Sequence, residues 1–480
     1  MKITNYKWAT VFFLLLLVGS ACDKFENMNV DPNNPSDVPT SSLLTQAQAN
    51  LVYNLNGEIS QLGSQYVQYF AQLDYTEKSN YSEDGISSFN GIYTAGLTDL
   101  TEIIRLNESE NRRGDVLQYG NNENQIAVAK ILMAWVYQNV TDVWGDVPYS
   151  EAINDEILRP KYDAQEDIYD GLISDLNSAQ DMMDLSPSIA LQGDLIFGGN
   201  MEKWDAFAES LKIRIAMRLT EVDDAKARDL IQSVDFDKAF SEATDYAHFA
   251  HLETEDEANP IYIDNVVNVG ADYFACANTF IDALNDLNDP RVVAFANPAV
   301  NSGLYVGQPY GIAEQGSDVD VSLPGDKYAS QTAPSILMTA AEILFAKAEA
   351  IARGYISGDA EATYNEAIRV SFLYNNIDES ELPAYLDQDG VRYDPANWAE
   401  LIGTQKWICL FAQGIQGWAE WRRLDYPILS PGPAAVISTI PRRRAYTSTE
   451  YATNRENIEE AVARLDSGRD LFTERVWWDK

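Results

Sequence analysis

The chain has 480 residues, of which 74 are acidic and 34 basic, so its formal net charge is -40 at pH 7. A hydrophobic content of 46% is that of a globular protein, and the length allows a large core. The negative field argues against nucleic acid and anionic membrane surfaces as partners, because both would be repelled. Neutral ligands, cations and a well-solvated extracellular surface are compatible with it.

The N-terminus has the pattern of a secretory signal. Two lysines precede a short apolar run at 9–18, which is too short to cross a bilayer as a stable helix. Three small residues at 19–21 stand directly before Cys22, as in a bacterial lipobox. We therefore expect residues 1–21 to be a signal peptide and Cys22 to be lipidated after cleavage. Ordinary cleavage that leaves Cys22 as a free thiol is the alternative.

The segment after the lipid cysteine, 22–42, is rich in Asn, Pro, Asp and Ser and predicts an extended tether. Helical periodicity begins at Leu43 and continues, with breaks, to Leu106. Within it, residues 75–89 are polar and aromatic, which predicts an exposed loop. Further helical patterns follow at 123–140, 162–183, 204–219 and 225–234.

Residues 235–334 lose helical periodicity and gain Asn, Pro, Gly and Tyr, which predicts loops and short elements laid over a helical frame. Residues 335–372 then predict two helices folded back on each other, with Gly354 at the position of a C-cap glycine. Small and apolar residues share one face of each helix, in a spacing similar to a tetratricopeptide (TPR) hairpin: Leu344, Ala348, Ile351, Ala360, Tyr364 and Ala367.

A single hairpin of this kind cannot bury its own apolar face, so it needs companions elsewhere in the chain. The helical patterns at 43–106, 123–183 and 204–234 supply three, and single helices are expected at 398–423 and 454–466. The predicted fold is thus mainly α, with four TPR-like helical hairpins and an irregular, loop-rich part that faces the ligand. We expect residues 43–480 to form one domain.

Residues typical of catalytic and metal sites are scarce. The only two histidines, His248 and His251, could approach each other on one helix turn, but packed or exposed imidazoles are the favoured interpretation. No nucleophile elbow, dinucleotide fingerprint, phosphate loop or zincin motif occurs in the sequence. We therefore expect no enzymatic activity, no cofactor and no metal.

Calcium binding, glycosidase activity and a disulfide are the alternatives to consider. The acidic pairs Asp318/Asp320 and Asp387/Asp389 are similar to parts of calcium loops, so calcium is the alternative to solvated loop charge. A glycosidase needs two carboxylates a few ångströms apart, and no pair stands out. Cys276 and Cys409 lie in apolar surroundings and are expected to be buried thiols, although a disulfide depends on their distance.

Binding is better supported than catalysis, because the chain has 26 Tyr and 10 Trp. Glycan recognition uses aromatic faces surrounded by polar side chains. Four tryptophans lie within helical periodicity and are expected in the core: Trp135, Trp204, Trp407 and Trp418. Packing is also the favoured interpretation for Trp144. Aromatic residues in the polar loops are the candidate ligand contacts: Tyr75, Tyr81, Phe89, Tyr262, Tyr273, Tyr305 and Tyr310.

A series of motifs follows in order along nearly the whole mature chain: MNVDPNNPSDVP after Cys22, TDVWGDVPYSEA with PKYDAQEDIY, SLKIRIAMRL, NDPRV, TQKWICLFAQGIQGWAEWRRLDYP, PRRRAYTSTEY and the closing VWWD. Together they resemble the SusD/RagB family of outer-membrane lipoproteins, specifically its SusD-like second branch. Each motif is modest alone, and their number makes the set specific.

The resemblance implies a body of four TPR-like units with an irregular ligand-facing part, anchored by lipid at the cell surface in the outer membrane. It implies a binding protein that captures glycans and passes them to a SusC-like TonB-dependent transporter, without chemistry of its own. A peptide-binding uptake protein of the same family is one alternative. A TPR scaffold that joins proteins and holds no small ligand is the other.

Overall fold

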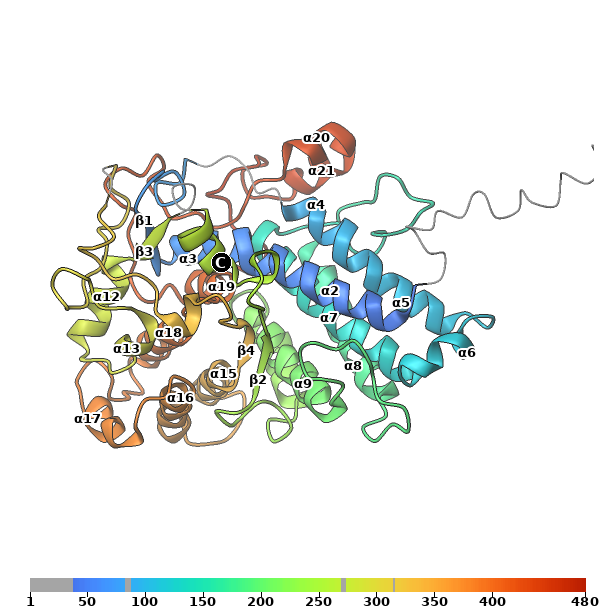
Figure 1. Cartoon of the computed structure of the whole chain (residues 1–480), viewed down its shortest axis with the longest axis horizontal. Helices are drawn as coiled ribbons and strands as arrows, with labels where there is room; N and C mark the ends of the chain where they lie inside the picture. The colour runs from blue at the N-terminus through green and yellow to red at the C-terminus, as the bar shows by residue number, and fades with distance from the viewer. Residues whose placement is uncertain (1–37, 83–87, 269–272, 314–315) are drawn as a thin grey trace, which may run out of the picture.

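The computed structural model describes residues 38–82, 88–268, 273–313 and 316–480 (Figure 1). The predicted signal peptide, Cys22 and most of the tether lie outside these ranges. None of the described helices is both long enough and apolar enough to cross a membrane.

The first part of the chain is helical, as expected. It contains α2 (Thr40–Asn54), α3 (Ser60–Tyr66), α4 (Ser88–Ile92), α5 (Thr98–Glu108) and α6 (Arg113–Val116), with π-helical turns at Leu55–Ile59 and Tyr93–Leu97 and a 3-10 turn at Leu117–Tyr119. Helix α2 begins three residues before the expected Leu43, so the predicted tether is wrong at 40–42. The carbonyl of Pro39 accepts hydrogen bonds from the backbone N–H groups of Ser42 and Leu43, which starts the helix earlier.

The next two helix pairs confirm the periodicity. They are α7 (Asn122–Trp144) with α8 (Gln165–Met182), and α9 (Met201–Arg218) with α10 (Asp224–Ser233). The side chain of Asn121 accepts hydrogen bonds from two N–H groups at the start of α7, and Gly145 ends that helix at φ 84°. Helix α7 packs against both α5 and α8, so the second pair is joined directly to the first.

The hairpin predicted at 335–372 is present as α15 (Ala340–Ala352) and α16 (Ala360–Tyr374), with Gly354 at φ 74° in the turn between them. Its first residues are not helical. They form strand β4 (Ser335–Thr339), which pairs antiparallel with β2 (Tyr246–Phe249). The helical period of the sequence did not reveal a partner strand about a hundred residues away.

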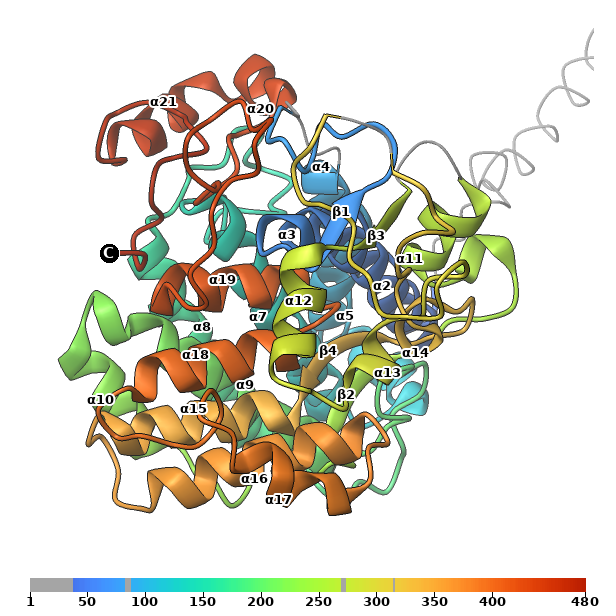
Figure 2. The same cartoon turned by 90° about the vertical axis from the view of Figure 1, so that its left-hand side faces the viewer.

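Residues 398–423, expected as one helix, form two. Helix α18 (Trp398–Cys409) ends before α19 (Gly414–Leu424), and Ala412 between them has a left-handed φ of 63°. Figure 2 shows α19, α18, α15 and α16 as successive layers, and each helix packs against the next. The stack places the C-terminal helices on the hairpin that the sequence predicted.

Besides β2, the predicted loop-rich middle contains only short elements: α11 (Pro260–Tyr262), β3 (Phe274–Cys276), α12 (Asn278–Asp286), α13 (Val292–Phe295) and α14 (Asp326–Ala329), with turns at Glu255–Glu257 and Ile263–Val267. The rest of the chain adds a 3-10 turn at Glu379–Glu381, α17 (Leu382–Leu386), α20 (Ser448–Thr453) and α21 (Arg455–Ala463). In Figure 1, α12, α13 and β3 of the middle region lie at the end of the molecule opposite α5 and α6. Strand β1 (Phe70–Gln72), from the first part of the chain, lies beside β3 at the same end.

One large hydrophobic cluster extends from Leu43 to Trp478, and a small separate cluster contains Leu73, Ala275 and Val321. The tryptophans expected in the core are all there, with 2% or less of their surface exposed: Trp135, Trp144, Trp204, Trp407 and Trp418. Cys276 and Cys409 are free thiols, and Cys276 is fully buried.

Candidate functional site

Strands β1 and β3 bring together the polar loops that carry two of the candidate aromatic residues. The strands pair antiparallel, and the ladder continues past β1, where the N–H of Leu73 donates to the carbonyl of Tyr273 at 2.9 Å. The carbonyl of Leu73 in turn accepts from the N–H of Gly316 at 2.9 Å. Three segments distant in sequence therefore meet at one edge, with Asp74 and Tyr75 directly after Leu73.

The hydroxyl of Tyr273 donates to a carboxylate oxygen of Asp318 at 3.2 Å across this edge. Partial burial, together with the charges of Asp318 and Asp74, raises the pKa of Tyr273 to about 12. The phenol thus stays protonated at neutral pH and keeps its hydroxyl hydrogen for donation. The edge offers an aromatic ring beside acceptor oxygens.

Tyr75 is the most exposed aromatic side chain of the described residues, with 61% of its surface accessible. Its backbone is left-handed, with φ 53°, which is uncommon for a residue other than glycine and costs energy unless the surroundings enforce it. Gln72 closes the loop that contains Tyr75, because its Oε1 accepts hydrogen bonds from the backbone N–H groups of Lys78 and Ser79. Ser79 also donates to buried Gln65, so the loop behind the exposed ring is fixed.

Tyr81 and Tyr310 are buried instead of exposed. Their hydroxyls lie 3.2 Å apart, and the Tyr81 ring packs edge-on against Tyr66 at 5.8 Å between centroids. The expectation of an exposed loop at 75–89 is therefore wrong at Tyr81, where a left-handed φ of 61° turns the chain inward. The polar neighbours of Tyr81 in the sequence concealed this packing.

Phe89 is also buried, with its ring 4.9 Å from that of Trp144, and it lines a separate cavity beside α20. Tyr262 and Tyr305 are partly exposed. No hydrogen bond within the described ranges links either of them to the β1–β3 edge. Of the seven candidates, Tyr75 and Tyr273 are the two that this edge brings together.

Sequence reasoning missed the side chains that build the edge, Gln72 and Gln65, because an isolated glutamine carries no signal of its role. Asp74 was likewise not singled out. Asp318 was noticed only as part of a calcium-like loop, and the structure places it as the acceptor of the Tyr273 hydroxyl.

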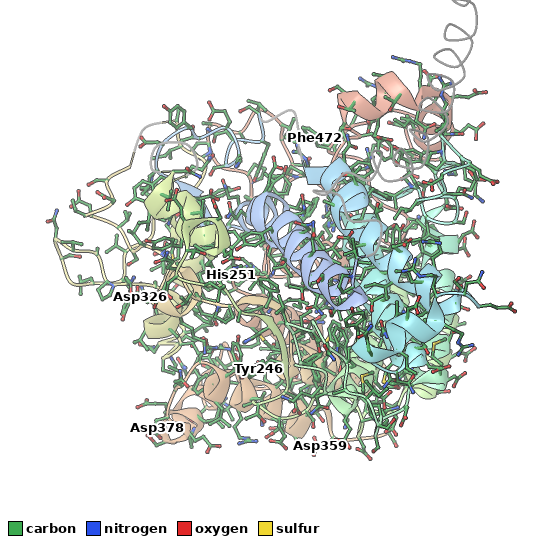
Figure 3. All side chains as sticks on the ribbon, turned by 45° about the vertical axis from the view of Figure 1, so that its right-hand side comes forward. Tyr246, His251, Asp326, Asp359, Asp378 and Phe472 are labelled. Carbon is green, nitrogen blue, oxygen red and sulfur yellow. The ribbon has the colours of Figure 1, made fainter. Side chains whose placement is uncertain are left out.

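The two histidines do not form a pair. His248 lies on strand β2, not on a helix turn, and its Nε2 is 2.8 Å from the hydroxyl of Tyr374. His251 is buried, with its Nε2 2.8 Å from the hydroxyl of Ser335. Figure 3 places His251 toward the middle of the molecule, whereas exposed acids such as Asp359 and Asp378 lie at its edge. Over the described ranges, no three His, Cys, Asp or Glu side chains are grouped to hold a metal ion.

Residues 32–447 match the family described as "Starch-binding associating with outer membrane", the SusD-like second branch. The chain belongs to this SusD-like family. The match covers most of the 480 residues and includes every helix from α2 to α19. The TPR-like helical fold expected from the sequence is thus the fold of the family. No curated protein matches the chain.

Solved structures agree with this assignment over nearly their whole length. A chitin-binding protein is 25% identical, with a TM-score of 0.79 over 92% of this chain and 99% of that one. A SusD homologue from Bacteroides uniformis is 24% identical, with a TM-score of 0.78 over 92% of this chain and 100% of that one. A chitin-binding SusD homologue from Flavobacterium johnsoniae is 21% identical, with a TM-score of 0.76 over 91% and 98%.

Proposed function

We propose that this SusD-like protein binds a neutral glycan at the β1–β3 edge and is not an enzyme. The observation that carries the proposal is the exposed side chain of Tyr75, two residues after Leu73, whose N–H donates to the carbonyl of Tyr273 in the Tyr273–Asp318 pair. Support also comes from the family description, which names starch binding, and from the two chitin-binding proteins of similar fold.

The chemistry of the edge suits sugar rings. An aromatic face packs against the C–H groups of a pyranose, and carboxylates accept hydrogen bonds from its hydroxyls. Asp74 and Asp318 supply those acceptors, while the fixed loop under Tyr75 limits the conformational entropy lost on binding. Anionic glycans are disfavoured, because the chain carries a net charge of -40.

The family description, which names association with the outer membrane, supports a proposal for the place of the protein in the cell. We propose that Cys22 carries a lipid that holds the protein in the outer membrane, exposed at the cell surface. A SusC-like TonB-dependent transporter is then the partner that receives the glycan. Growth with labelled palmitate, followed by a Cys22→Ala comparison, tests the anchor, and co-purification of a barrel transporter from outer membranes tests the partner.

Retardation in native gels tests glycan binding directly. Gels that contain soluble starch or glycol chitin are compared with a gel that has no polysaccharide, and bovine serum albumin serves as a non-binding marker. We expect the protein, and not the marker, to be retarded by at least one polysaccharide. Mobility that no glycan changes, together with binding to a peptide mixture, would replace the proposal by peptide uptake.

A further inference from the structure

A cavity lies away from the β1–β3 edge, between α4, the loop 148–160 and α20, with a volume of about 600 Å³. Such a volume is typical of sites that hold a small ligand. Figure 1 shows α4 and α20 together at the upper edge of the molecule, with β1 and β3 to their left. Among the aromatic candidates, Phe89 is the one that lines this cavity.

The wall of the cavity is held in place by hydrogen bonds at both ends of the loop. The carboxylate of Asp163 accepts from the N–H groups of Tyr149 and Ser150 and from the Ser150 hydroxyl. On the other side, the amide of Asn454 donates to the carbonyl of Pro160 at 2.8 Å. The loop is thus fastened to the helix that faces it, and the cavity exists before any ligand binds.

Two apolar residues of this loop, Ile153 and Leu158, line the cavity. Ile153 is β-branched and has a left-handed φ of 55°, an outlier for such a side chain. Leu158 lines the cavity and yet has 92% of its surface exposed. Ile153 also packs in part against the hydrophobic core, so the accessible part of its side chain and the exposed side chain of Leu158 form the apolar wall of the cavity.

The polar groups of the cavity define the kind of ligand. Glu450 uses one carboxylate oxygen to accept from the hydroxyl of Tyr162 at 2.8 Å, and within the described ranges no hydrogen bond reaches the other oxygen. Asn90 and Asn154 add side-chain amides, which donate and accept. No lysine or arginine is among the described lining residues, so an anion has no counter-charge there.

We propose that this cavity is a second carbohydrate subsite, selective for a hexopyranose that carries an N-acetyl group. The acetamido methyl packs on the aliphatic wall of Ile153 and Leu158, its N–H donates to the free oxygen of Glu450, and an asparagine amide donates to its carbonyl. A sugar with a hydroxyl at that position leaves the apolar wall uncovered. The inference rests on the proposed glycan binding and adds a ligand class to it.

Methyl-resolved NMR of the whole chain, labelled at isoleucine and leucine methyls, tests the subsite. N-acetylglucosamine is the probe, and glucose and glucosamine are its matched controls, because they differ from it only in the substituent at C2. We expect the Ile153 and Leu158 methyl resonances to shift with N-acetylglucosamine alone. The methyls of Ile428, exposed elsewhere on the surface, should not shift with any of the three.

A pair of charge-removing variants localises the ligand contact. Glu450→Gln keeps the shape of the side chain and should weaken N-acetylglucosamine about tenfold, the usual order for a hydrogen bond to a charged acceptor. Glu459→Gln removes the same charge from an exposed residue of α21 and should leave the affinity unchanged. Equal weakening by both variants would mean that the affinity depends on the net charge of the protein and not on Glu450 itself, and would overturn the proposed contact.

Three other results would also overturn the subsite: equal shifts with glucose, shifts with glucosamine alone, or no shift of Ile153 and Leu158 with any probe. If those methyls do not shift while an oligosaccharide still binds through Tyr75, the second subsite fails and the proposed function stands. If no glycan binds at either place, both fail.

Discussion

Arg423 and Glu349 form a buried ion pair with two parallel hydrogen bonds, each 2.6 Å between guanidinium nitrogen and carboxylate oxygen. Arg423 belongs to α19 and Glu349 to α15, two layers of the stack in Figure 2 with α18 between them. Neither side chain is exposed to solvent. The pair thus joins the C-terminal helices to the hairpin through the inside of the protein.

Replacing Glu349 by alanine is expected to lower the free energy of unfolding by about 3 kcal/mol or more, because it leaves the Arg423 guanidinium buried without its main partner. Urea unfolding followed by circular dichroism measures the change. The control is Glu459→Ala, whose partner Arg455 is exposed and whose removal should cost about 0.5 kcal/mol. Equal costs for both variants would contradict a structural role for the buried pair.

The same glutamate makes the protein sensitive to strong acid. Burial alone would raise the pKa of Glu349, but the charge and hydrogen bonds of Arg423 outweigh burial and lower it from 4.5 to about 2. Because the folded pKa lies below the unfolded one, the stability it contributes is present above pH 4.5 and is lost as the pH falls toward 2. The double variant Glu349→Leu/Arg423→Met should lose less stability in that window, as measured by urea midpoints at each pH.

His248 affects the stability of the fold at a higher pH than Glu349 does, so the two contributions can be measured separately. Burial and the nearby charge of Lys327 lower the pKa of His248 from 6.5 to about 3. Below pH 6.5 the unfolded chain binds a proton that the folded chain does not, so stability falls as the pH drops. Between pH 6 and 5, the His248→Gln variant should lose about 1 kcal/mol less per pH unit than the unmodified chain. Identical slopes would show that His248 is not held neutral.

Gly354 is needed for its backbone conformation, not for lack of space. It has a φ of 74°, and a Cβ added to it would meet no atom within 4 Å. Gly354→Ala should therefore destabilise the protein by about 1 kcal/mol through strain alone. Gly114 in α6 has equally open space without a left-handed φ, so Gly114→Ala should be neutral or stabilising. Thermal melts of the two variants that shift in the same direction would contradict this explanation.

The helical frame was predictable because its evidence is local. The faces of α15 and α16, the glycine between them and the core position of Trp204 all follow from a period of 3.6 residues. Breaks within helical sequence were not predictable in the same way. The left-handed turn at Ala412 splits 398–423, and β4 replaces the first turn of the hairpin, because each depends on contacts with distant residues.

The candidate site was predictable only in its residue types. Tyr75 and Tyr273 were expected from aromatic rings in polar loops, but so was Tyr81, which is buried against Tyr66. Two features distinguish Tyr75 and Tyr273 from Tyr81. They are the pairing of β1 with β3, about two hundred residues apart, and the hydrogen bonds that Gln72 accepts. Neither leaves a periodic signal in the sequence, so exposure could be determined only from the structure.

Glycan binding at the β1–β3 edge depends on the ring of Tyr75. Titration calorimetry with chitohexaose and maltohexaose should compare the unmodified chain with Tyr75→Ala and with Tyr246→Ala, which removes another exposed tyrosine from strand β2. We expect at least one sugar to bind, with an affinity about tenfold weaker in Tyr75→Ala, since a stacked ring contributes on the order of 1 kcal/mol or more. Tyr246→Ala should bind as the unmodified chain does. Unchanged affinity in Tyr75→Ala, or no binding of either sugar to the unmodified chain, would contradict the claim.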